Sequence, residues 1–580
     1  MQGQAVRSTQ QVADDFSSIE HGHTRAITYE DSSEHVGHHS PTSKNVALIA
    51  LLLSLRSFMK RELNFKRIAI RLLSAVLKSA VAAIAASLIW HKLKKRKNTT
   101  SPSKVAVVGS GIAGAGAAWT MNKSGIDVTV YEKKPKPGGN AKCMNWNVDG
   151  RKVDTGLAVF AWPDELFHNY NALIEELQVE TEFHDMKFYV TEKDEVAGTK
   201  LVFAHGKQNP SWVKEDLERW DELCRYIKSV NEWFSPSAYP SLYSMSWVNP
   251  LNLIPLKRLC QWWGVSQRFW DYVFVPVHTS TFLEVNMDSV PGSMGSLLND
   301  IVPFSATPRM KTWKTNAYDT VVAMLQDIKV KTSCGVETVT FNADGSVCVT
   351  DEDGESRQFD AVVFACSAQA MNRILHGEGQ PGENNIPPNN SNGLNSITSW
   401  LESFLLRQTL YTTDRDKTFE RGIVHTQSAA TIPAAHRDDV MREYCNYIEV
   451  KEPGDLENSF VISSWAPTAE EFPMLVTYNA DKKLDGLDTE WVSTSREAHP
   501  CLTTWQMMST TVLWPLLQGR RNAKCYFCGS AVLPGNGHDL SFLSGIVAAT
   551  ELGANYPFQK NKMAQQDFDR LRGMMLSAWA

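Results

Sequence analysis

Two short runs of β-branched apolar residues flank a helical segment near residue 110. The run VAVV after Lys104 predicts a buried strand, and the residues up to about Ser124 predict a helix that stops at Gly125. A second strand is predicted over 127–132. Strand, helix and strand in this order predict a βαβ unit, and with it an α/β fold built on a parallel sheet.

The residues before this unit follow other patterns. Residues 1–43 are polar, without apolar periodicity, and predict a disordered tail. Residues 44–100 hold two apolar runs and a single acid, Glu62, and predict a helical segment directed to a membrane. The run 72–90 is nearly long enough to span a bilayer. The basic residues around it share one sector of a helical wheel, which equally suits a helix lying on an anionic surface. A spanning helix, a surface helix and a purely soluble amphipathic segment all stay open as alternatives.

Composition narrows the classes of partner and compartment. The net charge of -6 gives no basic excess, so no nucleic-acid partner is expected. Ten scattered cysteines form no disulfide framework, which favours an intracellular, reducing compartment for the bulk of a membrane-associated chain. Cys525 and Cys528 have CxxC spacing, but on a predicted strand they are expected to be two buried thiols. No metal site is predicted.

The turn between the first strand and the helix has the spacing of a dinucleotide-binding loop. Gly109, Gly111 and Gly114 follow the pattern GxGxxG, in which the glycines allow a tight turn, a close approach of pyrophosphate and close packing of helix on strand. Glu132 ends the second strand, where a carboxylate binds ribose hydroxyls and disfavours the 2'-phosphate of NADP. A second pair, Gly138 and Gly139, suits a longer dinucleotide.

These motifs, with the segment containing Asp154, Thr155 and Gly156, resemble the superfamily of flavin-containing amine oxidases and phytoene desaturases. Within it the chain looks most like predicted NAD/FAD-binding proteins related to polyenoic fatty acid isomerases. The resemblance covers about 104–557 and implies a Rossmann-like FAD-binding domain of the GR2 type, built from discontinuous segments, with an inserted α+β substrate domain. The FAD-binding parts are predicted over 104–165, 311–375 and 516–580, and the substrate domain over 166–310 and 376–515.

More distant motifs carry the same resemblance. It implies that the backbone of Val336 meets the adenine and that the strand opened by Asp360 closes the nucleotide sheet. It also implies that the helix after the C-terminal glycine loop points its N-terminus at the flavin, with Asp539 or Ser541 as its N-cap. The predicted cofactor-binding residues are Gly109, Gly111, Ile112, Ala113, Gly114, Glu132, Lys133, Gly138, Gly139, Asn140, Thr155, Gly156, Val336, Gly529, Ser530, Asp539 and Leu540.

The chain also departs from the superfamily. It lacks a Gly-Gly pair before the returning segment, has Gly529-Ser530 in place of Gly-Glu, and has no attachment cysteine, so FAD is expected to bind non-covalently. The chain has no identifiable counterpart of the lysine that bridges to flavin N5 through water in amine oxidases. Lys314 is named as a candidate without a motif to support it.

The expected reaction is hydride transfer from an unsaturated lipid or isoprenoid to the flavin, giving desaturation or double-bond isomerisation. Aromatic residues are dense over 212–313, where they either line an apolar pocket or form a helix core. His538 is the predicted proton handler, because imidazole titrates near neutral pH, and His425 is a weaker candidate. The alternatives are an amine oxidase that releases hydrogen peroxide and a binding protein without turnover.

Overall fold

A computed structural model describes residues 101–576 except 149–150, 157–158, 197, 235–248, 283–286, 343, 377–408, 410–422, 466–473, 479–493, 497–502, 520–523, 534 and 536. The predicted tail and membrane-directed segment, residues 1–100, lie outside this description. Among the helices that the structure describes, none combines the length and apolar character needed to cross a bilayer.

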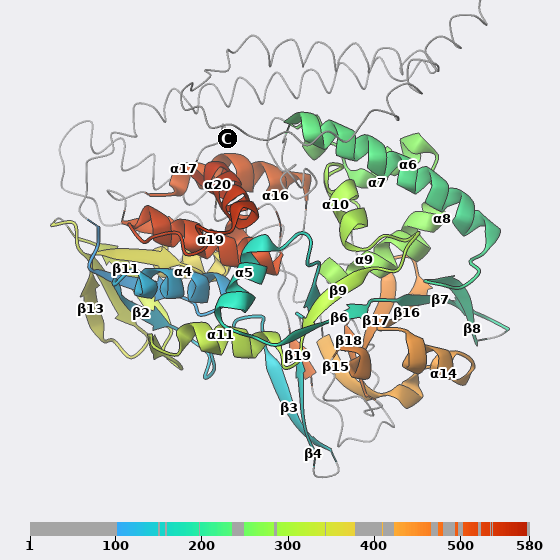
Figure 1. Cartoon of the computed structure of the whole chain (residues 1–580), viewed down its shortest axis with the longest axis horizontal. Helices are drawn as coiled ribbons and strands as arrows, with labels where there is room; N and C mark the ends of the chain where they lie inside the picture. Colours follow the sequence, from blue (N-terminus) through green and yellow to red (C-terminus); the bar gives the residue numbers. More distant parts are fainter. Residues whose placement is uncertain are drawn as a thin grey trace, which may run out of the picture. The chain divides into compact units, whose positions relative to one another are not determined.

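A five-stranded parallel sheet carries the predicted βαβ unit (Figure 1). Its strands come from four separate stretches of the chain, which confirms a Rossmann-like sheet built from discontinuous segments. The sequence predicted that the strand after Asp360 closes the sheet, and this prediction is wrong. The C-terminal strand pairs with it on its other side and forms the edge of the sheet. In order across the sheet the strands are β10 (Lys329–Lys331), β2 (Asp127–Tyr131), β1 (Lys104–Val108), β14 (Ala361–Phe364) and β20 (Cys525–Phe527).

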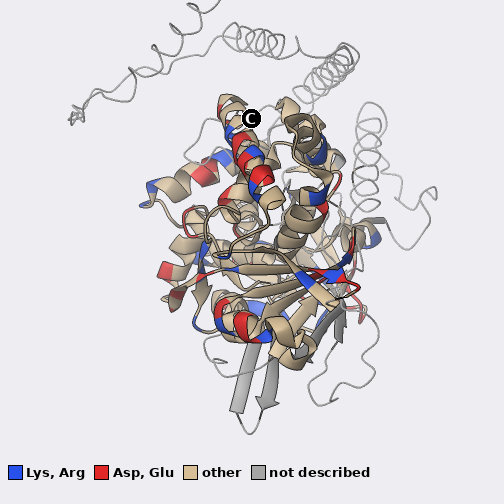
Figure 2. Cartoon of the chain, turned by 90° about the vertical axis from the view of Figure 1, so that its right-hand side faces the viewer, with Lys and Arg blue, Asp and Glu red and all other residues tan. Residues whose placement is uncertain are grey.

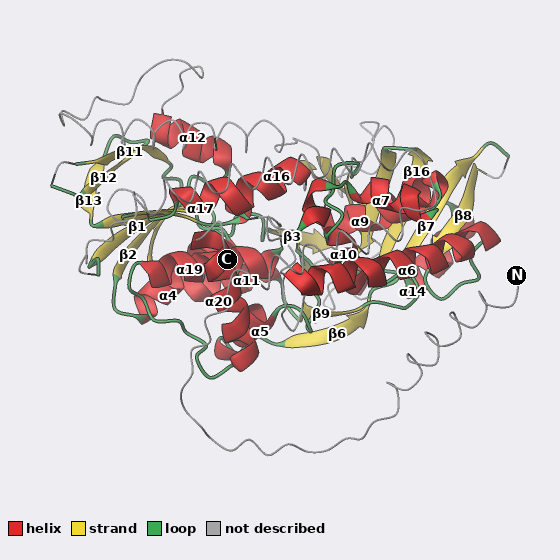
Figure 3. Ribbon diagram, turned by 90° about the horizontal axis from the view of Figure 1, so that it is seen from above, coloured by secondary structure: helices red, strands yellow, loops and turns green. Residues whose placement is uncertain are grey.

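Two helices pack closely against each other beside this sheet. They are α4 (Ile112–Lys123) and α19 (His538–Glu551), which lie side by side in Figures 1 and 3. A Cβ atom at Gly545 would lie 2.0 Å from the carbonyl oxygen of Ala113, and one at Gly116 would lie 2.7 Å from the ring of Phe542. Only glycine therefore allows this crossing, so the C-terminal helix is held against the start of the dinucleotide-binding unit.

Smaller antiparallel elements surround the parallel sheet. They are the hairpin β3 (Cys143–Val148) and β4 (Arg151–Gly156), the sheet β11 (Val336–Phe341), β12 (Val347–Asp351) and β13 (Ser356–Phe359), and the sheet β5 (Ala161–Trp162), β9 (Arg309–Trp313) and β6 (Thr181–Asp185). Three helices accompany them: α5 (His168–Glu176), α11 (Ala317–Leu325) and α20 (Lys562–Leu576). Helix α5 contacts both α19 and α20, and α11 contacts α4.

A seven-stranded mixed sheet lies in the part predicted to hold the substrate (Figure 1). Its order is β19 (Thr494–Arg496), β15 (Ile423–Ser428), β18 (Met474–Tyr478), β17 (Asp455–Val461), β16 (Asn446–Glu452), β7 (Phe188–Asp194) and β8 (Gly198–Ala204). Tyr189 and Tyr447 on one face share a core with Val440 of α14 (Ala434–Glu443). Ile448 and Val450 on the other face belong to the main core. The two faces of the sheet therefore belong to different environments.

Helices cover the main-core face of this sheet. Helix α9 (Val275–Phe282) contacts β7, β16 and β17 and directly follows the π-helical turn η3 (Trp270–Phe274). The rings of Trp220, Phe269, Phe274 and Phe304 pack on one another, with centroid distances of 5.1 to 6.5 Å. These members of the aromatic-rich stretch form helix core, the second of the two roles expected for it.

The remaining described helices and helical turns complete the cover. They are α6 (Ser211–Phe234), η2 (Pro250–Leu253), α7 (Leu256–Trp263), α8 (Gln267–Phe269), α10 (Met294–Ile301), α12 (Ala368–His376), η4 (Ala429–Thr431), α15 (Ile462–Trp465), α16 (Thr504–Met508), η7 (Ser509–Leu513), α17 (Trp514–Leu517) and η8 (Ser530–Val532). Figure 2 shows acidic and basic residues interspersed along the described elements, and many form ion pairs, such as Arg572 with Glu551 at 2.6 Å.

Candidate functional site

In the first glycine turn, two glycines leave no room for a side chain and the third does. A Cβ atom at Gly109, where φ is +102°, would lie 2.6 Å from the carbonyl oxygen of Ala365, and one at Gly114 would lie 1.9 Å from that of Gly109. At Gly111 the nearest atom, Cα of Gly139, would be 3.7 Å away. Gly109 and Gly114 therefore serve the fold, whereas Gly111 leaves room beside the backbone where α4 begins.

The second glycine pair packs on this turn. The N-H of Gly138 donates to the carbonyl oxygen of Ser110 at 3.2 Å, and Gly138 pairs with Gly111 as an isolated parallel bridge. Both glycines have positive φ, +115° and +60°. The loop that follows Glu132 is thereby returned to the start of α4, beside which Asn140 is exposed, Ile112 half-buried and Ala113 buried.

Glu132 directly follows β2, which ends one residue earlier than predicted, and its carboxylate is buried in the same turn. One oxygen accepts the N-H of Ser110 at 3.0 Å and its hydroxyl at 2.5 Å, and the other accepts the N-H of Lys134 at 2.9 Å. A carboxylate has about four acceptor positions, so Glu132 keeps capacity for a ribose hydroxyl. The side chain of Lys133 points elsewhere, since its ammonium pairs with Glu352 at 3.2 Å on the surface.

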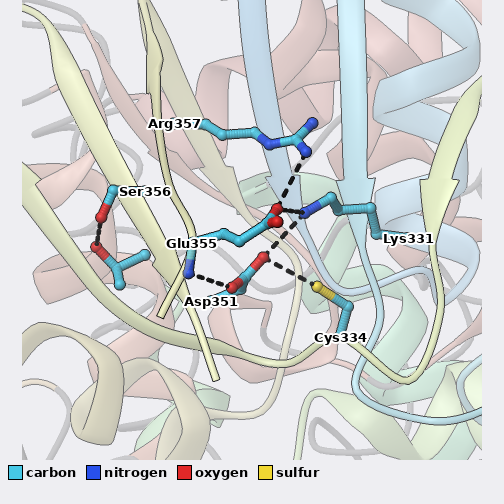
Figure 4. Close-up of polar contacts among 7 residues, drawn as sticks. Lys331, Cys334, Asp351, Glu355, Ser356 and Arg357 are labelled. Atoms are coloured by element: carbon cyan, nitrogen blue, oxygen red, sulfur yellow. Dashed lines mark hydrogen bonds and ion pairs between the residues drawn. The ribbon is translucent and has the colours of Figure 1, made fainter. Parts of the chain in front are cut away.

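A buried ion pair fixes the strand that carries Val336. The ammonium of Lys331 lies 2.9 Å from Asp351, whose carboxylate also accepts the thiol of Cys334 at 3.3 Å (Figure 4). Asp351 pairs in register with Val336, and the N-H of Cys334 donates to the carbonyl oxygen of Glu132 at 2.9 Å. The start of β11 is thus tied to the end of β2, where the adenosine half of a dinucleotide is expected to lie.

This network does not suit a metal ion. Donor atoms of Cys334, Asp351 and Asp353 lie within 4.8 Å of one another, but Lys331 already neutralises Asp351. Burial and the hydrogen bond to Asp351 raise the pKa of the Cys334 thiol, which keeps it protonated and a poor metal ligand.

The C-terminal motif is a strand, a glycine turn and a helix, as predicted, and Cys525 and Cys528 are buried thiols that form no disulfide with each other. Gly529 has φ of +96° and donates its N-H to the hydroxyl of Ser544 at 2.9 Å, and Ser530 begins the turn η8. The predicted N-cap is wrong. The cap is Gly537, because the helix begins one residue before Asp539, which places Asp539 within its first turn.

His538 and Asp539 are enclosed where α19 begins. Burial lowers the pKa of His538 to about 3, so its imidazole is neutral near neutral pH. Burial, reinforced by the charge of Asp567, raises the pKa of Asp539 to about 7. The titration near neutral pH expected of His538 is therefore found on its neighbour, and Leu540 beside them is buried.

Polar atoms without hydrogen-bond partners gather around these two side chains. The ring of Tyr170 lies 4.8 Å from that of His538 and 6.0 Å from that of Trp313. The Tyr170 hydroxyl lies near Thr320 and Trp313 without an aligned hydrogen bond. The buried atoms without partners are Tyr170 Oη, Trp313 Nε1, Thr320 Oγ1, His538 Nε2 and Asp539 Oδ2. We call these five residues the α19 cluster.

Such a cluster indicates a place where a polar ligand belongs, because buried polar groups are normally satisfied. Sequence reasoning found His538 and Asp539 but missed Tyr170, Trp313 and Thr320, which come from α5, β9 and α11. Their only sequence signal is a polar or aromatic residue within an apolar segment, which is common in ordinary cores.

The positions of four other residues named from the sequence give less information about the site. Thr155 and His425 lie on β4 and β15, but their side chains are outside the description. Gly156 ends β4, where a Cβ atom would lie 3.2 Å from the carbonyl oxygen of Val159. Lys314 is half-exposed and pairs with Glu180 at 3.1 Å, so it does not point into the interior.

Comparisons with known proteins agree with this arrangement. Residues 107–177 match the NAD(P)-binding Rossmann-like domain family. Hydroxyneurosporene desaturase from Rubrivivax gelatinosus is 42% identical over 314 residues, which cover 47% of this chain and 55% of the desaturase. A zeta-carotene-forming phytoene desaturase from Myxococcus xanthus is 33% identical over 75 residues, covering 13% of this chain and 14% of that protein. The alignment with hydroxyneurosporene desaturase thus spans only about half of the length of that protein.

The fold has relatives among solved structures. A putrescine oxidase structure aligns with a TM-score of 0.53 and 13% identity, covering 78% of this chain and 99% of the oxidase. At this identity the likeness shows the fold alone. The predicted closer relationship to polyenoic fatty acid isomerases stays a prediction.

FAD is the cofactor of this group, and the residues present fit it. Gly111 leaves the backbone open for a pyrophosphate, and Glu132 keeps acceptor capacity for a ribose. The α19 cluster offers unpaired donors and acceptors at a helix N-terminus, where partial positive charge favours an electron-rich ring edge. In its motifs, its fold and its sequence similarity the chain resembles the superfamily of flavin-containing amine oxidases and phytoene desaturases.

Proposed function

We propose that the chain is an FAD-dependent oxidoreductase that takes a hydride from an apolar, unsaturated substrate of the lipid or isoprenoid class. The observation that carries the proposal is the pair of sites joined by the α4 and α19 crossing. At the start of α4 lie open Gly111 and Glu132, and at the start of α19 lies the α19 cluster. Bound FAD would supply the hydride acceptor.

An aromatic cluster supports an apolar substrate. Phe160, shortly after Gly156, stacks on Phe460 of β17 with a centroid distance of 4.6 Å. Trp465 lies 5.2 Å from Phe160, and Tyr478 lies 5.4 Å from Phe460. We call these four residues the aromatic patch. It joins the segment after the hairpin of β3 and β4 to the seven-stranded sheet, and its rings favour contact with an extended hydrocarbon.

Two acid-base groups serve this proposal. His538 is a neutral hydrogen-bonding imidazole, and Asp539, with its pKa raised to about 7, is the residue that can hold or release a proton near neutral pH. Desaturation and isomerisation both fit this arrangement, and they differ in whether the hydride leaves the protein or returns to the substrate.

We further propose that the substrate reaches the protein from a membrane to which the segment 44–100 directs it. The support is the basic and apolar composition of this segment.

The test is the visible absorption spectrum of the full chain purified in detergent, repeated without oxygen after adding polyunsaturated fatty acids, carotenoid precursors or amines. A flavin spectrum bleached by an unsaturated lipid or isoprenoid is the expected result. Bleaching by amines, with peroxide on admission of air, would replace the proposal by an amine oxidase. A colourless protein that does not take up added FAD would overturn it.

A further inference from the structure

A second set of buried polar atoms without partners lies away from the α19 cluster, in the core beneath helix α9. His278 of α9 has no exposed surface, and neither of its ring nitrogens has a hydrogen-bond partner among the residues that the structure describes. Its neighbours include the rings of Phe274 and Phe304, at 4.6 and 5.4 Å. An imidazole with both nitrogens unpaired in an apolar core is costly, so the position calls for a ligand atom or water.

Two asparagines on the sheet share this shortage. Asn446 of β16 and Asn458 of β17 are fully buried and bonded to each other at 2.8 Å. Asn446 Oδ1 and Asn458 Nδ2 have no partner, so the pair keeps one free acceptor and one free donor. If both amides were turned round, one donor and one acceptor would still be unpaired.

The two asparagines and His278 belong to one layer of the core. Strand alternation puts Asn446 and Asn458 on the same face as Ile448, because Asn458 pairs with Ile448 and Asn446 lies two residues before it. Ile448 shares the main core with Val275 and Val277, and α9 contacts β16 and β17. Elements that contact one another therefore carry all three side chains, and both asparagines lie on the sheet face that belongs to the main core.

This layer adjoins the aromatic patch. Asn446 pairs directly with Phe460, whose ring stacks on Phe160. Phe160, which follows the hairpin of β3 and β4, thus contacts Phe460, and Phe460 lies beside the asparagine pair.

The chemistry of the three side chains selects the ligand. Burial lowers the pKa of His278 to about 3, and no charged side chain contributes to that shift, so the imidazole is neutral. A neutral imidazole and two amides can bind a hydroxyl or carbonyl group, but they offer no cation to neutralise a carboxylate.

We propose that His278, Asn446 and Asn458 bind an uncharged hydrogen-bonding group, a hydroxyl or a carbonyl, at one end of the apolar substrate. The proposal rests on the proposed function for the rest of that substrate.

The test compares three probes of equal chain length on the full-length, FAD-supplemented protein and on the flavin-free protein. Oleyl alcohol, octadecene and oleate are titrated at one detergent concentration, with tryptophan fluorescence as the readout. Oleyl alcohol is expected to bind about tenfold more tightly than octadecene, since one or two hydrogen bonds contribute about 1 kcal/mol each. Equal affinities for the two, or tightest binding of oleate, would overturn the proposal.

Variants locate the effect. His278→Leu and Asn458→Leu are each expected to abolish the preference for the alcohol while changing octadecene affinity by less than about twofold. His278→Gln keeps one donor and one acceptor and should retain part of the preference. Thr477→Val, on the opposite face of the sheet, is the matched control. A preference that stays undiminished in Asn458→Leu and in His278→Gln, whether or not His278→Leu folds, would show that the alcohol binds elsewhere.

The two proposals fail separately. A preference for the alcohol in a chain that never binds flavin would overturn the proposed function and leave the polar site standing. A flavoprotein without the preference would overturn the polar site alone.

Discussion

Three glycines in one turn meet two different physical demands. Gly109 and Gly114 are required by backbone contacts within the fold, whereas Gly111 has φ of -63° as the N-cap of α4 and a Cβ position in ordinary contact, 3.7 Å from Cα of Gly139. The fold tolerates a side chain at Gly111, and we expect such a side chain to clash only with a bound ligand. The pattern GxGxxG therefore mixes structural and functional positions, which mutation can separate.

For this reason we expect Gly111→Leu to fold but to lose FAD, because the side chain would fill the place of the pyrophosphate. Gly114→Ala should fail to fold, since its Cβ would lie 1.9 Å from a carbonyl oxygen. Circular dichroism and the flavin-to-protein ratio check both variants. Full flavin occupancy in Gly111→Leu would contradict the assignment of the turn.

Glu132 offers a second prediction for a single residue. Glu132→Ala removes the acceptor for the N-H groups of Ser110 and Lys134, so we expect the flavin-free protein to lose about 1–3 kcal/mol in its free energy of unfolding. Lys133→Ala is the matched control, because its ion pair is exposed. Urea unfolding measures both, and equal losses would show that the Glu132 bonds add nothing.

At the scale of elements, the position of Asp539 in the first turn of helix α19 exposes its carboxyl group to two opposed effects on its pKa. The N-terminus of the helix favours a negative charge, yet burial raises the pKa of Asp539 to about 7. Removal from water is the larger effect because, within the described part of the chain, the carboxylate accepts only one hydrogen bond, from the N-H of Tyr170 at 2.8 Å.

Asp539 should therefore make stability depend on pH. Its pKa in the folded chain exceeds the ordinary value of 3.8, so the folded state binds the proton more tightly and stability falls as pH rises from about 4 to about 7. Asp539→Asn should remove this dependence and gain up to about 4 kcal/mol relative to the natural chain at about pH 8, with a smaller gain at about pH 5. Urea unfolding of the flavin-free proteins is the measurement, and a gain that does not vary with pH would refute it.

At the scale of the whole molecule, the parallel sheet draws strands from residues 104–131, 329–331, 361–364 and 525–527. Long-range pairing of this kind makes the cofactor site depend on both ends of the described chain. All strands of the described sheets lie after residue 103.

We accordingly expect a chain lacking residues 1–100 to keep its flavin-to-protein ratio and to lose binding to anionic liposomes. The reason is that the basic and apolar segment, rather than the sheet, is proposed to contact the membrane. Co-sedimentation with liposomes and the flavin spectrum check the two parts. Unchanged liposome binding by the shortened chain would exclude this role for the segment.

The sequence by itself determined the βαβ unit, its acidic strand end and the C-terminal strand, glycine turn and helix. Each is a local pattern in which neighbouring residues set the backbone, and each lies where it was predicted. The resemblance to the superfamily also followed from these motifs, because their glycines are needed for backbone contacts that few other residues allow.

Only the tertiary structure decided which side chains meet. The neutral state of His538, the raised pKa of Asp539 and the unpaired atoms of Tyr170 and His278 all arise from burial by segments distant in sequence. The position of β14 inside the sheet and the N-cap at Gly537 likewise depend on what packs next to them. Desolvation and long-range pairing are properties of the packed core, and no local pattern in the sequence encodes them.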